Sequence, residues 1–314
     1  MVTLKTDMKI AMLYASWERF GETWSTSMSI KTELISRGYE VISYNLYHND
    51  GELLRDKNIR TYSAQGINIL HEHCRVGYKP DIVFCLDYGQ WDCVQFDKKY
   101  FPGSIVISES GDDPQAFRSN SSKAFKSHAM LSPDWRCVQA YRAHNVNAHW
   151  WTHFADERLF YPRDIAQEFG CVTTCGPRGN GLTEKVKEAL NDLFNNERYF
   201  YGKDYAERLA KGKIVFQCSQ YKEITRRIFE GMACRKLVIT DRLPEETNIN
   251  QLFAENEDIV YYDSADEAID KIKYYLENES EREKIANSGY AKVMKDHTAK
   301  ARVDALLKVY EELS

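Results

Sequence analysis

The sequence lacks the long apolar run of a membrane-spanning helix, since no stretch of its 314 residues approaches about 18 consecutive apolar side chains. It also lacks a strong excess of charge: the net charge of −5 does not mark a general nucleic-acid or membrane-surface binder. A secretory signal is not expected, because the apolar part of residues 1–16 is short and runs directly into a strand. We find neither internal repeats nor low-complexity tracts.

Two nucleotide-binding fingerprints and a zinc pattern are missing as well. The loop CGPRGNG at residues 175–181 has neither the spacing G-x-G-x-x-G nor the Gly-Lys-Ser/Thr of a P-loop. Among the eight cysteines, Cys171 and Cys175 flank three residues, but no second pair or nearby histidine completes a zinc site. We therefore expect reduced, buried thiols in a cytoplasmic protein, with no metal and no cofactor.

What the sequence does contain is an alternation of strands and helices. Its length suggests two domains, and a hydrophobic fraction of 43% is enough for two cores. Strands are expected at residues 9–15, 40–44, 81–86, 104–107, 129–132, 148–151, 169–174, 199–201, 214–217, 237–240 and 258–262. Helices are expected at residues 25–37, 66–75, 183–194, 265–277, 279–296 and 298–313, and a helix or turn at residues 205–211. This rhythm predicts two α/β, Rossmann-like domains with parallel sheets, facing each other across a cleft. The expected limits are 1–160 and 161–296, with 297–314 forming a helix that returns to the N-terminal domain.

The most informative segment is KIVFQCSQYKEITRRIFEGMACRKLVITD at residues 213–241. It reads as strand, loop, helix and strand, because Ile224, Ile228 and Met232 recur at helical spacing between two apolar runs. Parallel βαβ units bind ligands at the carboxyl ends of their strands, beside the N-terminus of the crossover helix. Two arginines in the first turns of that helix suit a diphosphate, and the following glutamate suits sugar hydroxyls. The ligand predicted by this combination is a nucleotide-sugar.

The side chains of Arg226 and Arg227 point about 100° apart on a helix, so we do not expect them to have the same role. We assign Arg227 to the phosphate and Glu230, against the apolar end of the helix, to the ribose hydroxyls. The alternative is that these arginines are solvated and pair with Glu223 and Glu230 at helical spacing.

A second cluster, ESGDDPQ at residues 109–115, directly follows an expected strand. Asp112 or Asp113 can supply a general base or bind acceptor hydroxyls, and the sequence does not choose between them. The alternative is an ordinary turn rich in Gly, Asp and Pro. His128 and His153 are weaker candidates for the base.

Two loops complete the candidate site. Arg178 lies in the glycine-containing loop at residues 175–181, where backbone amides can approach an anion. Gly21 lies in a similar loop after the first strand of the other domain. Asp87, which follows another strand, is placed on the acceptor side.

These segments resemble glycosyltransferases of the two-Rossmann-domain GT-B architecture, in particular the CgeB-type, spore-maturation-like group. Residues 213–302 carry the resemblance best, and DIVFCLDYGQ, ESGDDPQAF and SPDWRCVQAY extend it into the N-terminal half. The resemblance implies transfer of a sugar from a nucleotide-diphosphate sugar without an obligatory metal, with the donor on the C-terminal domain. It places Arg227 on the diphosphate and Glu230 on the ribose, with Thr225 and Arg226 assisting at the helix start.

The chain departs from the pattern at two points. Related retaining enzymes use a Glu-x7-Glu pair, whereas Glu223 and Glu230 are separated by six residues, which argues against Glu223 as the sugar-binding residue. The glycine usual after Ala-Cys is replaced by Arg235, which either narrows the range of turn conformations or adds a surface contact.

Three functional classes follow. We expect an active glycosyltransferase whose acceptor is a glycan, a protein or a modified DNA base, although the acidic charge gives a nucleic-acid acceptor no support. A catalytically silent nucleotide-sugar sensor or scaffold is the alternative. A dinucleotide-dependent dehydrogenase is the third, and the missing glycine fingerprint argues against it.

Overall fold

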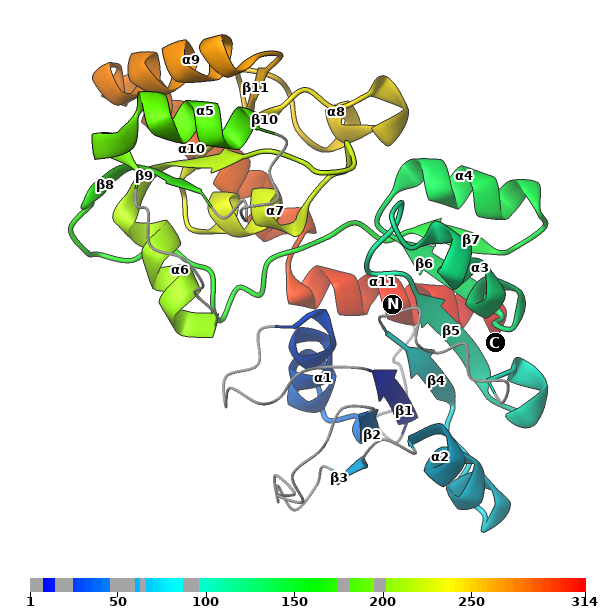
Figure 1. Cartoon of the computed structure of the whole chain (residues 1–314). Coiled ribbons are helices and arrows are strands. Elements are labelled where there is room, and N and C mark those ends of the chain that lie inside the picture. The colour runs from blue at the N-terminus through cyan, green and yellow to red at the C-terminus, as the bar shows by residue number, and fades with distance from the viewer. Residues whose placement is uncertain are drawn as a thin grey trace. The chain divides into compact units, whose positions relative to one another are not determined.

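The computed structural model describes residues 8–14, 25–45, 60–62, 66–86, 96–173, 181–194 and 202–314. The chain divides into two compact units, Met1–Thr152 with Arg302–Ser314 (unit 1) and His153–Ala301 (unit 2) (Figure 1). The observed division after Thr152 and the expected limit after residue 160 both fall in the connection between the last strand of unit 1 and the first strand of unit 2.

Unit 1 is built on a parallel sheet whose strands follow the order β3-β2-β1-β4-β5-β6-β7. The strands are β1 (Lys9–Tyr14), β2 (Glu40–Asn45), β3 (Arg60–Tyr62), β4 (Ile82–Cys85), β5 (Ile105–Glu109), β6 (Ala129–Ser132) and β7 (Ala148–Trp150). The order reverses between β1 and β4, as in a doubly wound fold. β4 and β6 are buried along their whole length, because helices cover both faces of such a sheet.

The helices of unit 1 are α1 (Thr26–Ser36), α2 (Gly66–Arg75), α3 (Phe117–Phe125), α4 (Trp135–Ala143) and α11 (Ala299–Leu313), with a 3₁₀ turn at Lys98–Tyr100 (Figure 1). α11 belongs to this unit from Arg302 onward. The indole N–H of Trp151 donates to the Arg302 carbonyl oxygen (3.1 Å), and the Arg302 guanidinium donates to Thr152 Oγ1 (3.0 Å). An ion pair of 2.6 Å joins Asp304 to Arg37 of α1.

Unit 2 has a parallel sheet of order β11-β10-β9-β8. Its strands are β8 (Phe169–Thr173), β9 (Gly212–Gln217), β10 (Leu237–Asp241) and β11 (Val260–Tyr262). Its helices are α5 (Leu182–Ala189), α6 (Gly202–Lys211), α7 (Arg226–Ala233), α8 (Ile249–Leu252), α9 (Ala265–Glu277) and α10 (Glu279–Asp296), with 3₁₀ turns at Asn191–Leu193 and Glu245–Thr247.

The crossover helix α7 is held close to this sheet by Gly231. A Cβ atom at Gly231 would lie 3.0 Å from a methyl group of Val238 on β10 and 3.2 Å from the side chain of Val215 on β9. The missing side chain therefore lets α7 approach the two strands that it connects. The N-terminus of α7 is fixed relative to their carboxyl ends.

The structure confirms an α/β fold with parallel sheets. The expected helices at Gly66–Arg75 and Ala265–Glu277 have these bounds in the structure. The helix expected at 183–194 is instead α5 followed by a 3₁₀ turn. α3, α4 and β3 were not predicted. Among the described residues, no helix combines the length and apolar character that crossing a membrane requires.

Candidate functional site

In unit 2, the loop between β9 and α7 is anchored on a buried carboxylate at the end of β10. Asp241, which is 2% exposed, accepts hydrogen bonds from the backbone N–H of Ser219 (2.7 Å) and from its hydroxyl (2.5 Å). Lys222 Nζ lies 2.8 Å from the same carboxylate, and Lys222 adopts a left-handed backbone conformation with φ of 51°. These contacts fix the loop at the carboxyl edge of the sheet.

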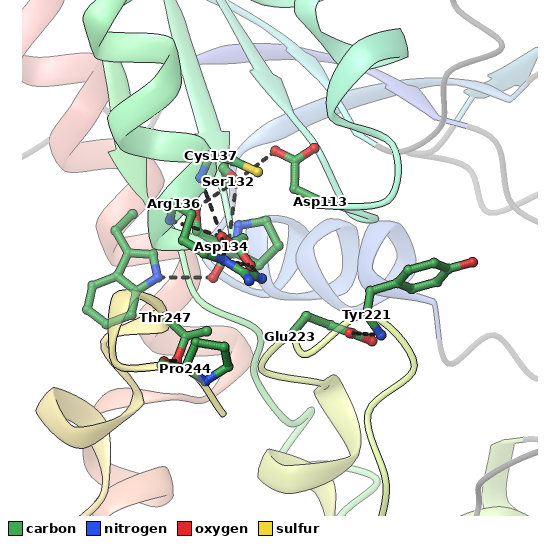
Figure 2. A network of polar contacts seen from close by, with 11 residues as sticks. Asp113, Ser132, Asp134, Arg136, Cys137, Tyr221, Glu223, Pro244 and Thr247 are labelled. Atoms are coloured by element: carbon green, nitrogen blue, oxygen red, sulfur yellow. Dashed lines mark hydrogen bonds and ion pairs between the residues drawn. The ribbon is translucent and has the colours of Figure 1, made fainter. Parts of the chain in front are cut away.

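Glu223 stabilises the same loop from within. Its carboxylate accepts the backbone N–H of Tyr221 at 2.6 Å (Figure 2), and the Tyr221 ring is exposed. Burial, aided by the charge of Asp241, raises the pKa of Glu223 above its ordinary value. The carboxylate of Glu223 therefore has a local role in the turn.

α7 begins at a residue whose side chain does not cap it. Thr225 occupies the N-cap position with φ −90° and ψ 153°, but its hydroxyl makes no capping hydrogen bond. Thr225 is 6% exposed, and its Oγ1 has no hydrogen-bond partner among the described residues. A buried hydroxyl without a partner is costly, and here it lies at the positive end of a helix dipole.

The two arginines of α7 have different environments. Arg226 Nε lies 2.8 Å from Glu230 Oε1, one turn along the helix, and its guanidinium lies 5.5 Å from the centre of the Phe154 ring. Glu230 is 1% exposed and accepts a hydrogen bond from the Tyr205 hydroxyl of α6 at 3.0 Å. Burial raises the pKa of Glu230, while Arg226 and Tyr205 oppose that rise. The sequence assigned Glu230 to ribose hydroxyls, whereas the structure buries its side chain and gives it two protein partners.

The environment of Arg227 differs from that of Arg226. Arg227 is half-buried, and within the described residues no hydrogen bond or ion pair holds its guanidinium. Together with the Thr225 hydroxyl, it gives the start of α7 a cation and a donor that the described residues of unit 2 do not satisfy. This arrangement is suited to an anion.

His153, the first residue of unit 2, lies beside this helix start. Burial and the charges of Arg226 and Arg227 lower the pKa of His153 to about 3. Its imidazole is therefore neutral at pH 7.

In unit 1, the two adjacent aspartates after β5 have different environments. Asp113 is 3% exposed and accepts hydrogen bonds from Ser132 Oγ (2.8 Å), Tyr141 OH (3.2 Å) and Asn120 Nδ2 (3.2 Å). Burial still raises the pKa of Asp113. Asp113 is thus enclosed within the fold.

Asp112 is the accessible member of the pair. Its side chain is exposed, and desolvation together with the neighbouring charge of Asp113 raises the pKa of Asp112, with Lys123 opposing. A carboxylate with a raised pKa that solvent can reach suits general-base chemistry better than an enclosed one. Geometry therefore favours Asp112.

A polar network continues from Asp113 along the carboxyl edge of this sheet (Figure 2). The backbone N–H of Asp134 donates to Ser132 Oγ at 3.3 Å, and the carboxylate of Asp134 caps α4 by accepting the backbone N–H of Arg136 at 2.9 Å. The Arg136 guanidinium donates to the same carboxylate at 2.6 Å. This network fixes Ser132, one of the donors to Asp113.

His128 is a structural residue. Its Nδ1 accepts the backbone N–H of Val106 at 2.9 Å, and it lies just before the first residue of β6, at the edge of the sheet opposite the carboxyl ends. Both observations argue against His128 as the catalytic base.

The structure thus groups Thr225, Arg226, Arg227 and Glu230 in unit 2, and Asp112 with Asp113 in unit 1. Gly21, Arg178 and Asp87 lie outside the described residues. Sequence reasoning missed the partners Tyr205, Asp241, Ser132 and Tyr141, all distant along the chain from the residues they contact. Within the described ranges, no three His, Cys, Asp or Glu side chains come together as metal ligands.

Comparisons with known proteins bear on the family and the fold. Residues 175–308 match the family described as glycosyl transferase-like, so the chain carries a glycosyl transferase-like domain. No curated protein matches the chain by sequence.

Similar solved structures cover nearly the whole chain. A sucrose-phosphate synthase from Thermosynechococcus elongatus has a TM-score of 0.73 at 12% identity, covering 98% of this chain and 99% of the other. Anabaena Alr3699/HepE in complex with UDP and glucose has a TM-score of 0.72 at 10% identity, covering 97% and 100%. An alpha-glucosyltransferase in complex with UDP and a 13-mer DNA containing a HMU base has a TM-score of 0.65 at 12% identity, covering 97% and 100%. The chain shares the fold of these proteins.

Proposed function

We propose that the protein is a glycosyltransferase of the GT-B type, related to the CgeB group, that transfers a sugar from a nucleotide-diphosphate sugar without a metal. The observation that carries this proposal is the start of α7, where a buried hydroxyl and an arginine lie in the same turn, neither with a polar partner among the described residues. Alr3699/HepE, which shares the fold, is known with UDP and glucose bound.

The donor diphosphate lies at this helix start. Arg227 contacts a phosphate oxygen through charge-assisted hydrogen bonds, the Thr225 hydroxyl donates to a second oxygen, and the helix dipole favours the negative charge. Arg226 acts indirectly, because its guanidinium is engaged with Glu230. Arg178 adds a further charge from its loop, and Gly21 belongs to the matching loop of the acceptor domain.

The ribose contact of Glu230 stays a prediction. Both carboxylate oxygens have protein partners, Arg226 on one and Tyr205 on the other. Ribose hydroxyls bind Glu230 only if they replace one of these partners.

The reaction forms a bond between an acceptor oxygen and the anomeric carbon while the bond from that carbon to the diphosphate oxygen breaks. The diphosphate leaves with the electron pair, and Arg227 with the helix dipole stabilises its charge. In an inverting reaction Asp112 takes the proton of the acceptor hydroxyl, whereas a retaining reaction does not require this base.

The wider arrangement belongs to the same proposal. An acceptor domain (residues 1–160) and a donor domain (161–296) face each other across a cleft, the helix at 297–314 returns to the first domain, and closure excludes water. The protein acts in the cytoplasm on a glycan, a protein or a modified DNA base. The DNA-bound alpha-glucosyltransferase of the same fold supports including a modified DNA base among the acceptor classes to be tested.

Release of free nucleotide from UDP-glucose and GDP-mannose tests this proposal. The chain should release UDP or GDP in the presence of acceptor extracts, and more slowly by hydrolysis without them. Asp112→Asn serves as the variant and Asp192→Asn, on an exposed 3₁₀ turn of unit 2, as the matched control. Binding of a nucleotide-sugar with neither hydrolysis nor transfer would contradict the enzymatic role.

A further inference from the structure

The carboxylate of Glu230 lies between the first turns of two helices, α6 and α7. The Tyr205 hydroxyl, in the first turn of α6, donates to Glu230 Oε2 at 3.0 Å. The other oxygen, Oε1, lies 2.8 Å from Arg226 Nε at the start of α7. α6 leads into β9 and α7 follows β9, so both helices begin toward the carboxyl edge of the sheet. The contact between Tyr205 and Glu230 therefore lies on the same side of unit 2 as the start of α7.

This carboxylate is closed to solvent. Glu230 is 1% exposed and Tyr205 is 7% exposed. The ring of Tyr205 packs edge-on against the buried ring of Phe160, with 5.7 Å between the ring centres. A hydroxyl group of a ligand therefore reaches Glu230 only when one of its two present partners moves aside.

The chemistry of the two partners determines which of them can be exchanged. Displacing Arg226 would leave a buried carboxylate without its cation, which is strongly destabilising. Displacing Tyr205 by a ribose hydroxyl exchanges one neutral O–H donor for another, so the buried oxygen of Glu230 keeps a hydrogen bond. Burial raises the pKa of Glu230, and the charge of Arg226 opposes that rise more than the hydrogen bond from Tyr205 does. Tyr205 is therefore the exchangeable partner.

We propose that the Tyr205 hydroxyl and a ribose hydroxyl of the donor nucleotide compete for Glu230 Oε2. This inference rests on the proposed function and names the side chain that the ribose replaces. Tyr205 holds the oxygen in the free protein, a ribose hydroxyl takes its place in the complex, and Tyr205 returns when the nucleoside diphosphate leaves. The competition weakens nucleotide binding and so favours product release, a step that limits turnover in many enzymes.

Tyr205→Phe removes only the competing oxygen, and isothermal titration calorimetry with UDP-glucose and GDP-mannose measures the effect. The free variant has no hydrogen bond from residue 205 to give up. It should therefore bind the nucleotide-sugar that the wild-type protein binds at least about ten-fold more tightly. A tyrosine that only positions Glu230 predicts the opposite, weaker binding in Tyr205→Phe.

Ligands without ribose hydroxyls locate the effect on the sugar of the nucleotide. UDP and GDP are compared with their 2′,3′-dideoxy forms, and the gain in Tyr205→Phe should be absent with the dideoxy forms. 3-Fluorotyrosine incorporated at position 205 gives a second readout that keeps the hydroxyl. Its ¹⁹F resonance should shift when the nucleotide with its ribose hydroxyls binds.

Tyr141→Phe is the matched control, because the Tyr141 hydroxyl donates to the buried carboxylate of Asp113 in unit 1 at 3.2 Å. This variant loses the same kind of hydrogen bond and should keep the wild-type affinity. Unchanged or weaker binding by Tyr205→Phe, an equal gain with the dideoxy forms, or an unmoved ¹⁹F resonance would overturn this inference and leave the proposed function standing. Failure of the wild-type protein to bind either nucleotide-sugar would overturn both.

Discussion

Arg226 and Glu230 form an ion pair across one turn of α7, with 2.8 Å between Nε and Oε1, and Glu230 is 1% exposed. The adjacent Arg227 has no such partner among the described residues. Two neighbouring arginines with the same chemistry are therefore divided between a structural role and a free cation at a helix start. This division is the reason for proposing Arg227, and not Arg226, as the contact of the diphosphate.

Alanine substitution of the two arginines should affect stability to very different extents. Arg226→Ala leaves the buried carboxylate of Glu230 without its cation and should lower the free energy of unfolding by about 3–5 kcal/mol. Arg227→Ala should change it by less than about 0.5 kcal/mol, because no ion pair is lost. Urea unfolding of both variants measures the difference. Equal destabilisation would contradict the division of roles.

Thr225→Val replaces the hydroxyl by a methyl group of similar size. Because Oγ1 is buried and has no partner among the described residues, its removal should raise the free energy of unfolding by about 1 kcal/mol. The same change should weaken nucleotide-sugar binding, since a donor to the diphosphate is lost. Thr247→Val is the control, because the Thr247 hydroxyl donates to the Pro244 carbonyl oxygen at 2.7 Å (Figure 2). The Thr247→Val protein loses this hydrogen bond and should therefore be less stable than the wild-type protein.

Asparagine substitution of Asp112 and of Asp113 should affect activity and stability differently. Asp112→Asn should lower an inverting transfer rate by about 10²–10⁴-fold with little change in stability. Asp113→Asn should destabilise the fold, because an amide cannot accept all three donors that hold Asp113. A stable, inactive Asp113→Asn protein alongside an active Asp112→Asn protein would reverse the assignment.

The stability effect of Asp113→Asn should also depend on pH. Burial raises the folded-state pKa of Asp113 above its unfolded value, so its contribution to stability is complete below the unfolded pKa and is lost as pH rises through the folded pKa. The cost of Asp113→Asn should therefore be largest in acid and shrink toward neutral pH. Unfolding curves at several pH values measure it.

Arg235 occupies a position suited to glycine. Its φ is 56°, and α7 ends there with the Arg235 N–H bonded to the Met232 carbonyl oxygen and the Lys236 N–H to that of Gly231, a Schellman motif. Its guanidinium lies 4.6 Å from the Tyr290 ring centre, so the arginine also adds a surface contact. The free energy of unfolding of Arg235→Gly should exceed that of Arg235→Ala by at least about 1 kcal/mol. The alanine variant keeps the strain of a left-handed backbone and loses the contact with Tyr290. Equal stability of the two variants would remove this explanation.

The fold was largely predictable because buried parallel strands read as apolar runs, as at β4 and β9. α3 was missed because its sequence FRSNSSKAF has no apolar repeat and buries Lys123 at 2% exposure. Within the site, the helix start was predictable from local spacing. The Tyr205 partner of Glu230 was not, since tertiary packing alone brings them together. The choice between Asp112 and Asp113 likewise needed side-chain directions that a turn does not reveal in sequence.

The central claim is that the start of α7 binds the diphosphate of a nucleotide-sugar through Arg227. Isothermal titration calorimetry of the wild-type protein, Arg227→Ala and the control Arg235→Ala with UDP-glucose and GDP-mannose tests it directly. The wild-type and Arg235→Ala proteins should bind one of the two. Arg227→Ala should bind it about 10–150-fold more weakly, the effect of losing a charged hydrogen bond. Unchanged affinity in Arg227→Ala, or no binding of either compound by the wild-type protein, would contradict the claim.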